Sequence, residues 1–465
     1  MTKKIRLEKD LLGAMEIPDD KYFGIQTQRA ITNFPLTNKK LSQYPELIRA
    51  LAYVKKACGQ SNLSLNLLSD KKYKMIESAV SEIATGKFDE AFPIDMIQGG
   101  AGTSCNMNIN EVVANLGLSL NGHQKGDYTQ LHPNTDVNMS QSTNDVYPTA
   151  IRLSILIKQQ GLLTNLEKII NSLRTKADAF NHILKLARTQ LQDAVPMTLG
   201  QEFKGFASTL NEDLKLIKAN SNLLTEVNLG GTAVGTGINT KKGYAELSVE
   251  NLATITGFPF TLAEDLIEAS SDMGAFVIYS ASLKRLAIKL SKIANDMRLL
   301  SMGPRAGLSE IRLPARQPGS SIMPGKVNPV IPEAVSQSAY QVIGYDTAIT
   351  MAAEAGQLQL NAMEPLIAVN VLDALDLLTN AIDMFDRLCI QGIEANELRC
   401  KNLLDNSLGL VTALNPYLGY ETATQIAQQA LMSDRSVIDL IKEQALLSDE
   451  QIADILRPEN MTQPN

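Results

Sequence analysis

The sequence has few of the residues that build disulfide frameworks and metal centres. It holds only four cysteines and three histidines in 465 residues. The cysteines show no C-x-x-C spacing, so we expect free thiols in a reducing compartment and no zinc site. The histidines form no H-x-x-x-H or H-E-x-x-H pair, which disfavours a histidine-based metal site. We therefore predict that the chain binds no metal through such motifs.

Long hydrophobic runs are also absent. No stretch of 18 apolar residues occurs, so we expect no membrane-spanning segment. The basic start at residues 1–6 is not followed by the apolar region of a secretory signal. A net charge of −7 is mild for this length and disfavours nonspecific binding to nucleic acid. These absences predict a cytoplasmic protein with neither nucleic acid nor membrane as a partner.

What the chain does have is helical periodicity. Its 44% hydrophobic content is typical of globular proteins, and its length exceeds one ordinary core. In 283–300 the apolar residues form a heptad-like stripe with lysines outside it, and strand-like alternation is scarce. We therefore predict a mostly α fold of elongated antiparallel bundles. The expected helices are 44–68, 72–86, 148–180, 199–227, 283–300, 332–361 and 366–390.

The densest group of chemically useful residues is 319–329, which reads Gly-Ser-Ser-Ile-Met-Pro-Gly-Lys-Val-Asn-Pro. Glycine and proline hold the backbone of such a loop in conformations that expose its donors. Two serines, a lysine and an asparagine suit the binding of a carboxylate and of negative charge that builds on it. The alternative interpretation is a proline-rich connector between helices.

Two further blocks cluster hydroxyl groups. Residues 99–104 are rich in glycine and include Thr103. In the second block, Ser142 is followed directly by Thr143. Neither 99–104 nor 230–237 has the spacing of a nucleotide-binding loop. Serine and threonine taken singly more often cap helices. Together with the cation of the 319–329 loop, the blocks predict a site for a small dianion.

A proton taken from carbon beside a carboxylate leaves a dianionic enediolate, which needs donors already aimed at its oxygens. A base is needed as well. Serine is a poor base unless nearby positive charge and loop donors stabilise its ionised form. Ser320, six residues before Lys326, has the surroundings in sequence that this requires.

These blocks resemble the motifs of the aspartase/fumarase superfamily, whose members eliminate fumarate from their substrates. The matching stretches are 99–108, 141–145, 188–196 and 319–329, and the resemblance covers nearly the whole chain. Residues 354–365 are similar to the version found in the aspartate ammonia-lyase branch. The resemblance implies reversible deamination of L-aspartate to fumarate and ammonia without an organic cofactor. Activation by a divalent cation is not readable from the sequence.

The resemblance also implies an architecture. It places a central helical-bundle domain at 142–398, with a smaller N-terminal domain at 1–141 and a small C-terminal domain at 399–465. It implies a homotetramer whose active sites are each assembled from three subunits.

The same resemblance assigns roles to individual residues. Ser320 matches the residue that abstracts the proton, and Asn144 matches the one that contacts the leaving amino group. The residues matched to binding of the β-carboxylate are Thr103, Ser142, Thr143 and Ser321. Those matched to binding of the α-carboxylate are Thr189, Lys326 and Asn328.

The chain departs from the superfamily pattern at Gln190, where many members carry histidine. Glutamine cannot act as a general base, so the change favours deamination over hydration of fumarate. Thr135 stands where relatives often have an acidic residue, so the resemblance gives no support for a secondary anion site there. Two alternatives remain open: a class II fumarate hydratase, and a catalytically silent helical oligomer that binds dicarboxylates.

Overall fold

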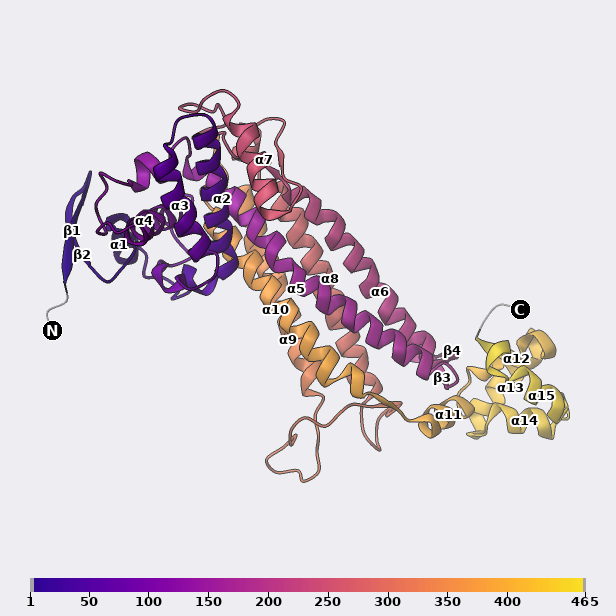
Figure 1. Cartoon of the computed structure of the whole chain (residues 1–465). Coiled ribbons are helices and arrows are strands. Elements are labelled where there is room, and N and C mark those ends of the chain that lie inside the picture. The colour runs from indigo at the N-terminus through magenta and orange to yellow at the C-terminus, as the bar shows by residue number, and fades with distance from the viewer. Residues whose placement is uncertain (1–3, 463–465) are drawn as a thin grey trace. The chain divides into compact units, whose positions relative to one another are not determined.

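The structure is a computed structural model that describes residues 4–462, so the first three residues of the basic start lie outside it. The chain forms two compact units, and Figure 1 labels the helices and strands that build them. The first unit holds residues 1–162, 216–284 and 341–377, and the second holds 163–215, 285–340 and 378–465. Five long helices contribute residues to both units. They are α5 (Thr143–Ala179), α6 (Leu199–Asn220), α8 (Gly274–Leu300), α9 (Val330–Glu354) and α10 (Glu364–Leu388).

The first unit adds a helical cluster and a short antiparallel hairpin to its share of the long helices. Glu111 accepts hydrogen bonds from the backbone N–H groups of Gly24, Gln26 and Thr27, so a buried carboxylate holds the start of α1. The elements that lie wholly in this unit are β1 (Ile5–Asp10), β2 (Gly13–Pro18), α1 (Ile25–Asn33), α2 (Pro45–Ser64), α3 (Asp70–Ile83), α4 (Thr103–Leu120), β5 (Glu226–Val227), α7 (Tyr244–Thr256) and β6 (Thr261–Leu262).

The second unit combines a β-hairpin with a set of short helices. The hairpin strands β3 and β4 pair antiparallel, and α11 packs on β3. A separate apolar core of α12 to α15 is built around Leu414, Ile426 and Ile441. The elements that lie wholly in this unit are β3 (Leu184–Thr189), β4 (Gln192–Thr198), β7 (Ile311–Arg312), β8 (Glu394–Ala395), α11 (Glu397–Asp405), α12 (Leu410–Leu418), α13 (Tyr420–Ser433), α14 (Val437–Glu443), α15 (Asp449–Ile455) and α16 (Pro458–Met461).

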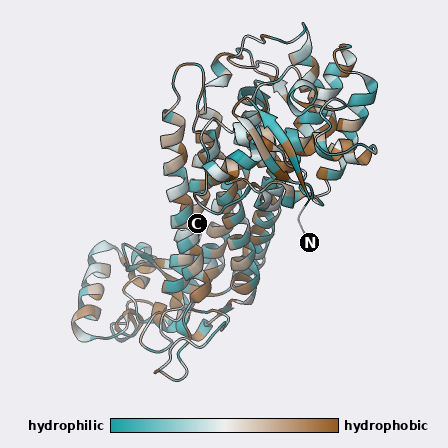
Figure 2. Cartoon of the chain, turned by 90° about the vertical axis from the view of Figure 1, so that its left-hand side faces the viewer, coloured by the Kyte–Doolittle hydropathy of each residue, from teal (hydrophilic) through white to brown (hydrophobic). Residues whose placement is uncertain are grey.

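The long helices pack through apolar stripes and a few buried polar bridges. The predicted stripe of 283–300 is buried, with Leu286 and Met297 fully inaccessible. Polar and apolar residues are mixed along these helices, as Figure 2 shows. In the first unit Lys284 of α8 pairs with Asp346 of α9 at 2.6 Å. In the second, Lys289 of α8 pairs with the buried Asp213 of α6 at 3.3 Å.

The mostly α prediction is confirmed, and each of the seven expected helices has a counterpart with shifted ends. Helix α8 begins nine residues earlier than the stripe indicated, and α9 ends at Glu354 rather than at 361. Helices α1, α4, α7 and α11 to α16 were not predicted. The division at 141 and 398 stays a prediction.

One stretch, Glu364–Gly392, is long and apolar enough to cross a membrane by length and composition. Of its most apolar window, 67% is buried inside the structure. Burial among other helices is the pattern of a core helix, and it accounts for the apolar composition of α10 without a membrane.

Candidate active site

The 319–329 loop lies in the second unit and surrounds the hydroxyl of Ser320 with backbone donors. The N–H groups of Ile322 and Met323 both donate to Ser320 Oγ, at 3.2 and 3.0 Å. Two donors aimed at one hydroxyl oxygen stabilise negative charge on that oxygen. The geometry therefore favours the ionised form of Ser320 that a serine base requires.

The loop is closed on itself just beside Ser320. The N–H of Gly319 donates to the carbonyl of Lys326 at 2.7 Å, and Asn328 Nδ2 donates to the carbonyl of Gly319 at 2.8 Å. A Cβ at position 319 would lie 2.7 Å from the Lys326 carbonyl oxygen, so only glycine fits there. These contacts hold the loop as one stiff turn.

Lys326 is exposed and, within residues 4–462, takes part in no ion pair. It lines a pocket of about 480 Å³ together with Ser320, Gln317 and Pro324. With Asn328 it also lines a second pocket of about 670 Å³. The structure thus brings Ser320 and Lys326 together on one cavity, with the cation free to bind a carboxylate. Ser321 is exposed at the surface of the same loop.

Thr189 and Gln190 lie at the tip of the β3–β4 hairpin, also in the second unit. Thr189 ends β3 and pairs with Gln192, which leaves Gln190 and Leu191 as a two-residue turn. Both turn residues have positive φ, 54° and 65°. The tip is exposed, so its side chains are available to a ligand.

The remaining predicted residues lie in the first unit. Thr103 begins α4, directly after three residues with positive φ at 100–102. Its hydroxyl donates to the carbonyl of Gly100 at 2.7 Å. A Cβ on Gly102 would lie 2.3 Å from the ring of Tyr147, so α4 and α5 approach each other closely at this point. The start of a helix is a favourable place for an anion, because its N–H groups point outward.

Ser142, Thr143 and Asn144 form the start of α5. Ser142 Oγ accepts a hydrogen bond from the N–H of Asn144 at 3.3 Å, so it caps the helix as the residue type alone predicts. Asn144 Nδ2 donates to the carbonyl of Ala233 at 2.7 Å. Asp145 accepts from the N–H of Ser142 and from two N–H groups of the glycine-rich loop at 230–232. The 230–237 loop is therefore part of this region, which the sequence analysis did not foresee.

A buried polar network supports Thr143. Lys55 Nζ donates to Asn106 Oδ1 at 2.7 Å, to Asn138 Oδ1 at 3.0 Å and to Gln141 Oε1 at 2.8 Å. Asn106 Nδ2 in turn donates to Thr143 Oγ1 at 3.1 Å. Thr143 Oγ1 accepts this bond and donates to no acceptor among the described residues, so its proton is available to a ligand.

The same network contains two groups with perturbed acidity. Complete burial lowers the pKa of Lys55 to about 7, an effect opposed by nearby Asp145. Burial likewise raises the pKa of Asp145 to about 6, although the bonds from backbone N–H groups favour its charged form. The start of α5 therefore lies over an ionisable pair in the core.

Lys55 was not predicted as part of the site, although its position in the sequence marks it as unusual. In α2 the side chain falls among Leu51, Val54 and Cys58, so a lysine stands on the buried face of an amphipathic helix. Thr135, the other departure from the superfamily pattern, has a role that stays open. It lines a pocket of about 470 Å³ with Ser142 and Ala233.

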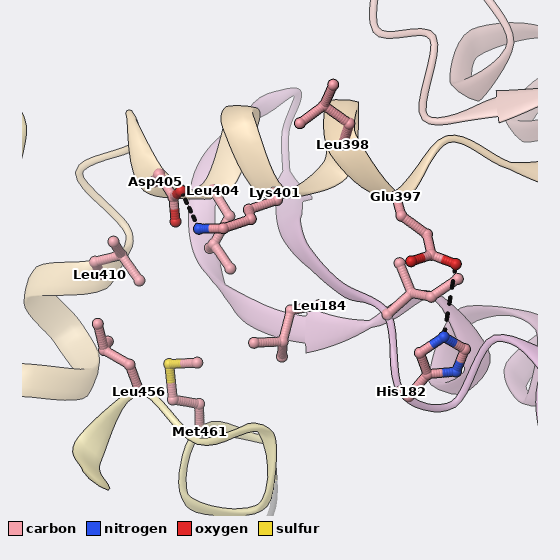
Figure 3. A pocket seen from close by; sticks show the side chains of 11 residues that line it. His182, Leu184, Glu397, Leu398, Lys401, Leu404, Asp405, Leu410, Leu456 and Met461 are labelled. Carbon is pink, nitrogen blue, oxygen red and sulfur yellow. Dashed lines mark hydrogen bonds and ion pairs between the residues drawn. The ribbon is translucent and has the colours of Figure 1, made fainter. Parts of the chain in front are cut away.

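Another cavity of the second unit holds none of the predicted residues. Its volume is about 490 Å³, and it lies between the start of β3 and α11 (Figure 3). His182 faces Glu397 across its edge at 3.6 Å, and leucines line the floor. We assign no part of the reaction to this cavity.

Comparison with known proteins agrees with the motifs. A family model described as lyase matches residues 13–344, and one described as fumarase C C-terminus matches 410–463. The chain belongs to the aspartase/fumarase superfamily. The matched ranges include every residue of the candidate site.

Several superfamily members are similar to the chain over nearly its full length. An aspartate ammonia-lyase of Pseudomonas canavaninivorans is 60% identical over 99% of this chain and 97% of its own. A solved fumarate lyase of Brucella melitensis, described as bound to cobalt, is 52% identical, with a TM-score of 0.97 over 99% and 100% of the two chains. A solved class II fumarase of Schistosoma mansoni is 35% identical, with a TM-score of 0.94 over 99% of this chain and 100% of its own.

Proposed function

We propose that the chain catalyses the reversible deamination of L-aspartate to fumarate and ammonia. Proton abstraction from C3 gives an enediolate, from which ammonia leaves. The relatives named aspartate ammonia-lyase support the reaction, since they are 50% to 60% identical over nearly the full chain. The observation that carries the mechanism is the pair of loop N–H groups on Ser320 Oγ.

Ser320 acts as the base in this proposal. An ordinary serine alkoxide is inaccessible near neutral pH, so its charge has to be stabilised in place. The N–H groups of Ile322 and Met323 do this directly, and the Lys326 ammonium on the same cavity adds positive charge. The proton of C3 passes to Ser320 Oγ, and the electron pair moves onto the β-carboxylate.

The hydroxyl groups hold the carboxylate on which charge accumulates. Thr143 offers its proton, since its hydroxyl accepts from Asn106 and donates to no acceptor among the described residues. Lys326 and Asn328 bind the α-carboxylate, and Asn328 keeps one N–H for this after bonding Gly319. The other residues that bind the β-carboxylate in the proposal are Thr103, Ser142 and Ser321. Thr103 donates to it once its hydroxyl turns away from the Gly100 carbonyl. Thr189 completes the α-carboxylate set, and Asn144 contacts the leaving amino group.

We further propose a cytoplasmic homotetramer with shared active sites and no organic cofactor. The candidate residues are divided between the two compact units of the chain. Large apolar side chains on α8 and α9 are exposed in the single chain, among them Ile288 at 51%, Tyr340 at 59% and Met351 at 62%. Burial of such side chains drives association between subunits.

A class II fumarase is the second candidate, because a fumarase of Schistosoma mansoni has the same fold. Gln190 argues against it, since hydration needs a base for water and glutamine supplies none.

The experiment is a direct assay of the purified protein, following fumarate formation from L-aspartate and from L-malate. We expect rapid turnover of L-aspartate and little of L-malate. Equal or faster turnover of L-malate would overturn the assignment, and turnover of neither would favour a dicarboxylate-binding protein.

A further inference from the structure

We propose that Glu310 is a positioning residue for binding of the α-carboxylate. Through Lys185 and Arg188 it fixes the turn that carries Thr189 and Gln190. This inference rests on the proposed function, because it uses the role of Thr189 in holding that carboxylate.

The turn needs external support because its backbone is strained. Two-residue hairpin turns with positive φ at both positions favour Asn-Gly or Asp-Gly, which tolerate this conformation. Here the two positions are Gln190 and Leu191, with φ of 54° and 65°. Leu191 is 71% exposed, so packing at the tip does not hold it. Strained residues of this kind persist only where the surrounding structure enforces them.

The support lies at the base of the hairpin. The register of β3 against β4 shifts between Leu186 and Arg188, so the ladder is irregular just before Thr189. Lys185 precedes the irregularity and Arg188 follows it. Glu310 Oε2 lies 3.0 Å from Lys185 Nζ, and Glu310 Oε1 lies 3.0 Å from Arg188 Nη1. One carboxylate thus holds the strand on both sides of the shift.

The bridge is buried and balanced in charge. Glu310 is fully inaccessible and Lys185 is 2% exposed. Lys185 also pairs with Glu202 at 2.6 Å, so two cations face two carboxylates. Removing one partner of a buried pair is costly, because it leaves the other charges buried and unpaired.

The backbone of Glu310 is held in place by two hydrogen bonds within the second unit. Its N–H donates to the carbonyl of Leu300, and its carbonyl accepts from the N–H of Asn396, both at 2.9 Å. The next residue begins β7, which pairs with β8 and leads into the loop of Ser320. The Glu310 carboxylate therefore resists movement of the hairpin tip against this frame, in addition to the packing of α11 on β3.

A merely structural ion pair would have the same burial, so the test needs a matched control. Asp213 provides it. Asp213 is also fully inaccessible in the second unit and also faces two cations, Arg285 at 3.0 Å and Lys289 at 3.3 Å. It lies on α6, and both of these cations lie on α8 rather than on the hairpin strands. Glu310→Gln and Asp213→Asn each remove one buried charge with little change in shape.

We expect both variants to unfold at lower temperature than the wild type, but only Glu310→Gln to raise KM for L-aspartate. The rise should be ~10- to 100-fold, the size of effect that a misplaced contact produces. The kcat value should change much less, because the α-carboxylate is held in the ground state as well as in the transition state. The Kd for succinate, measured by calorimetric titration, should rise in parallel with KM.

Equal KM values in Glu310→Gln and Asp213→Asn would overturn the inference, as would a loss confined to kcat. If Glu310→Gln does not fold, Arg188→Ala replaces it, and added guanidinium ions should restore KM. Failure of that rescue in a folded variant would also overturn the inference. Absence of L-aspartate turnover in the wild type would instead count against the proposed function. Succinate titrations of wild type and variant then still decide the role of Glu310.

Discussion

At the scale of single residues, the surroundings of each ionisable group decide whether it carries charge. Ser320 is surrounded by donors that favour its anion. Lys55 is fully buried, yet its three contacts are all acceptor oxygens that match an ammonium. Glu364, the first residue of α10, is instead a buried carboxylate without such partners. Among the described residues, neither of its carboxylate oxygens has a hydrogen-bond partner.

Glu364 should make the stability of the protein depend on pH. Burial raises its pKa well above the ordinary 4.5, and the buried Arg152 opposes this effect only in part. The folded protein then holds a proton that the unfolded chain releases. The contribution of Glu364 to the free energy of unfolding is therefore complete below pH 4.5. Above that pH it is lost by up to ~1.4 kcal/mol per pH unit.

We therefore expect Glu364→Gln to remove this loss, because glutamine stays neutral. Urea denaturation between about pH 5 and 7 should show the variant gaining stability relative to the wild type as pH rises. Glu421→Gln, on an exposed position of α13, controls for loss of a surface carboxylate. Stability curves for wild type and Glu364→Gln that stay parallel over this range would contradict the account.

The residues of the site were predictable from sequence to the extent that they stand in motifs. Ser320, Lys326 and Asn328 share a loop, and the structure brings them onto adjoining cavities. Lys55 and Glu310 stand far in sequence from the residues that they support. Only the folded chain shows these contacts, and no spacing rule would have found them.

At the scale of elements, apolar periodicity predicted the helices that bury one face. It missed α4, because nearly every side of this helix is buried and several of its buried side chains are polar. Asn106, Asn108, Asn110, Glu111 and Asn115 of α4 are all buried. When polar side chains form their hydrogen bonds inside the protein core, the helix shows no separate apolar and polar faces in its sequence.

The β3–β4 hairpin was missed for a different reason. Its turn lacks the glycine or asparagine that signals a two-residue turn, and Pro196 lies within β4. The turn conformation comes from the ion pairs at its base and not from its own sequence. A local conflict of this kind between residue type and backbone is typical of functional positions.

At the scale of the whole molecule, the proposed tetramer makes a prediction about mixed subunits. In the proposed site Thr143 and Ser320 come from different subunits. Ser320→Ala and Thr143→Val proteins should each be nearly inactive. Mixing them after dissociation should restore part of the activity, because some sites then receive both wild-type residues.

The control for this experiment is a mixture of Ser320→Ala with Lys326→Ala. Both residues line one cavity of a single chain, so each site of a mixed tetramer carries one of the two changes. No recovery is expected. A fully active monomer in sedimentation, or hybrids of the first mixture without activity, would contradict the shared site.

In the proposed mechanism Ser320 removes the C3 proton of L-aspartate. Exchange of that proton with solvent measures this step. In deuterated water, NMR follows the incorporation of deuterium at C3. Ser320→Ala should slow this exchange by at least the ~10²- to 10⁴-fold typical of a missing general base, while succinate still binds. Exchange in Ser320→Ala at the wild-type rate would contradict this mechanism, and would reduce the loop to a binding role.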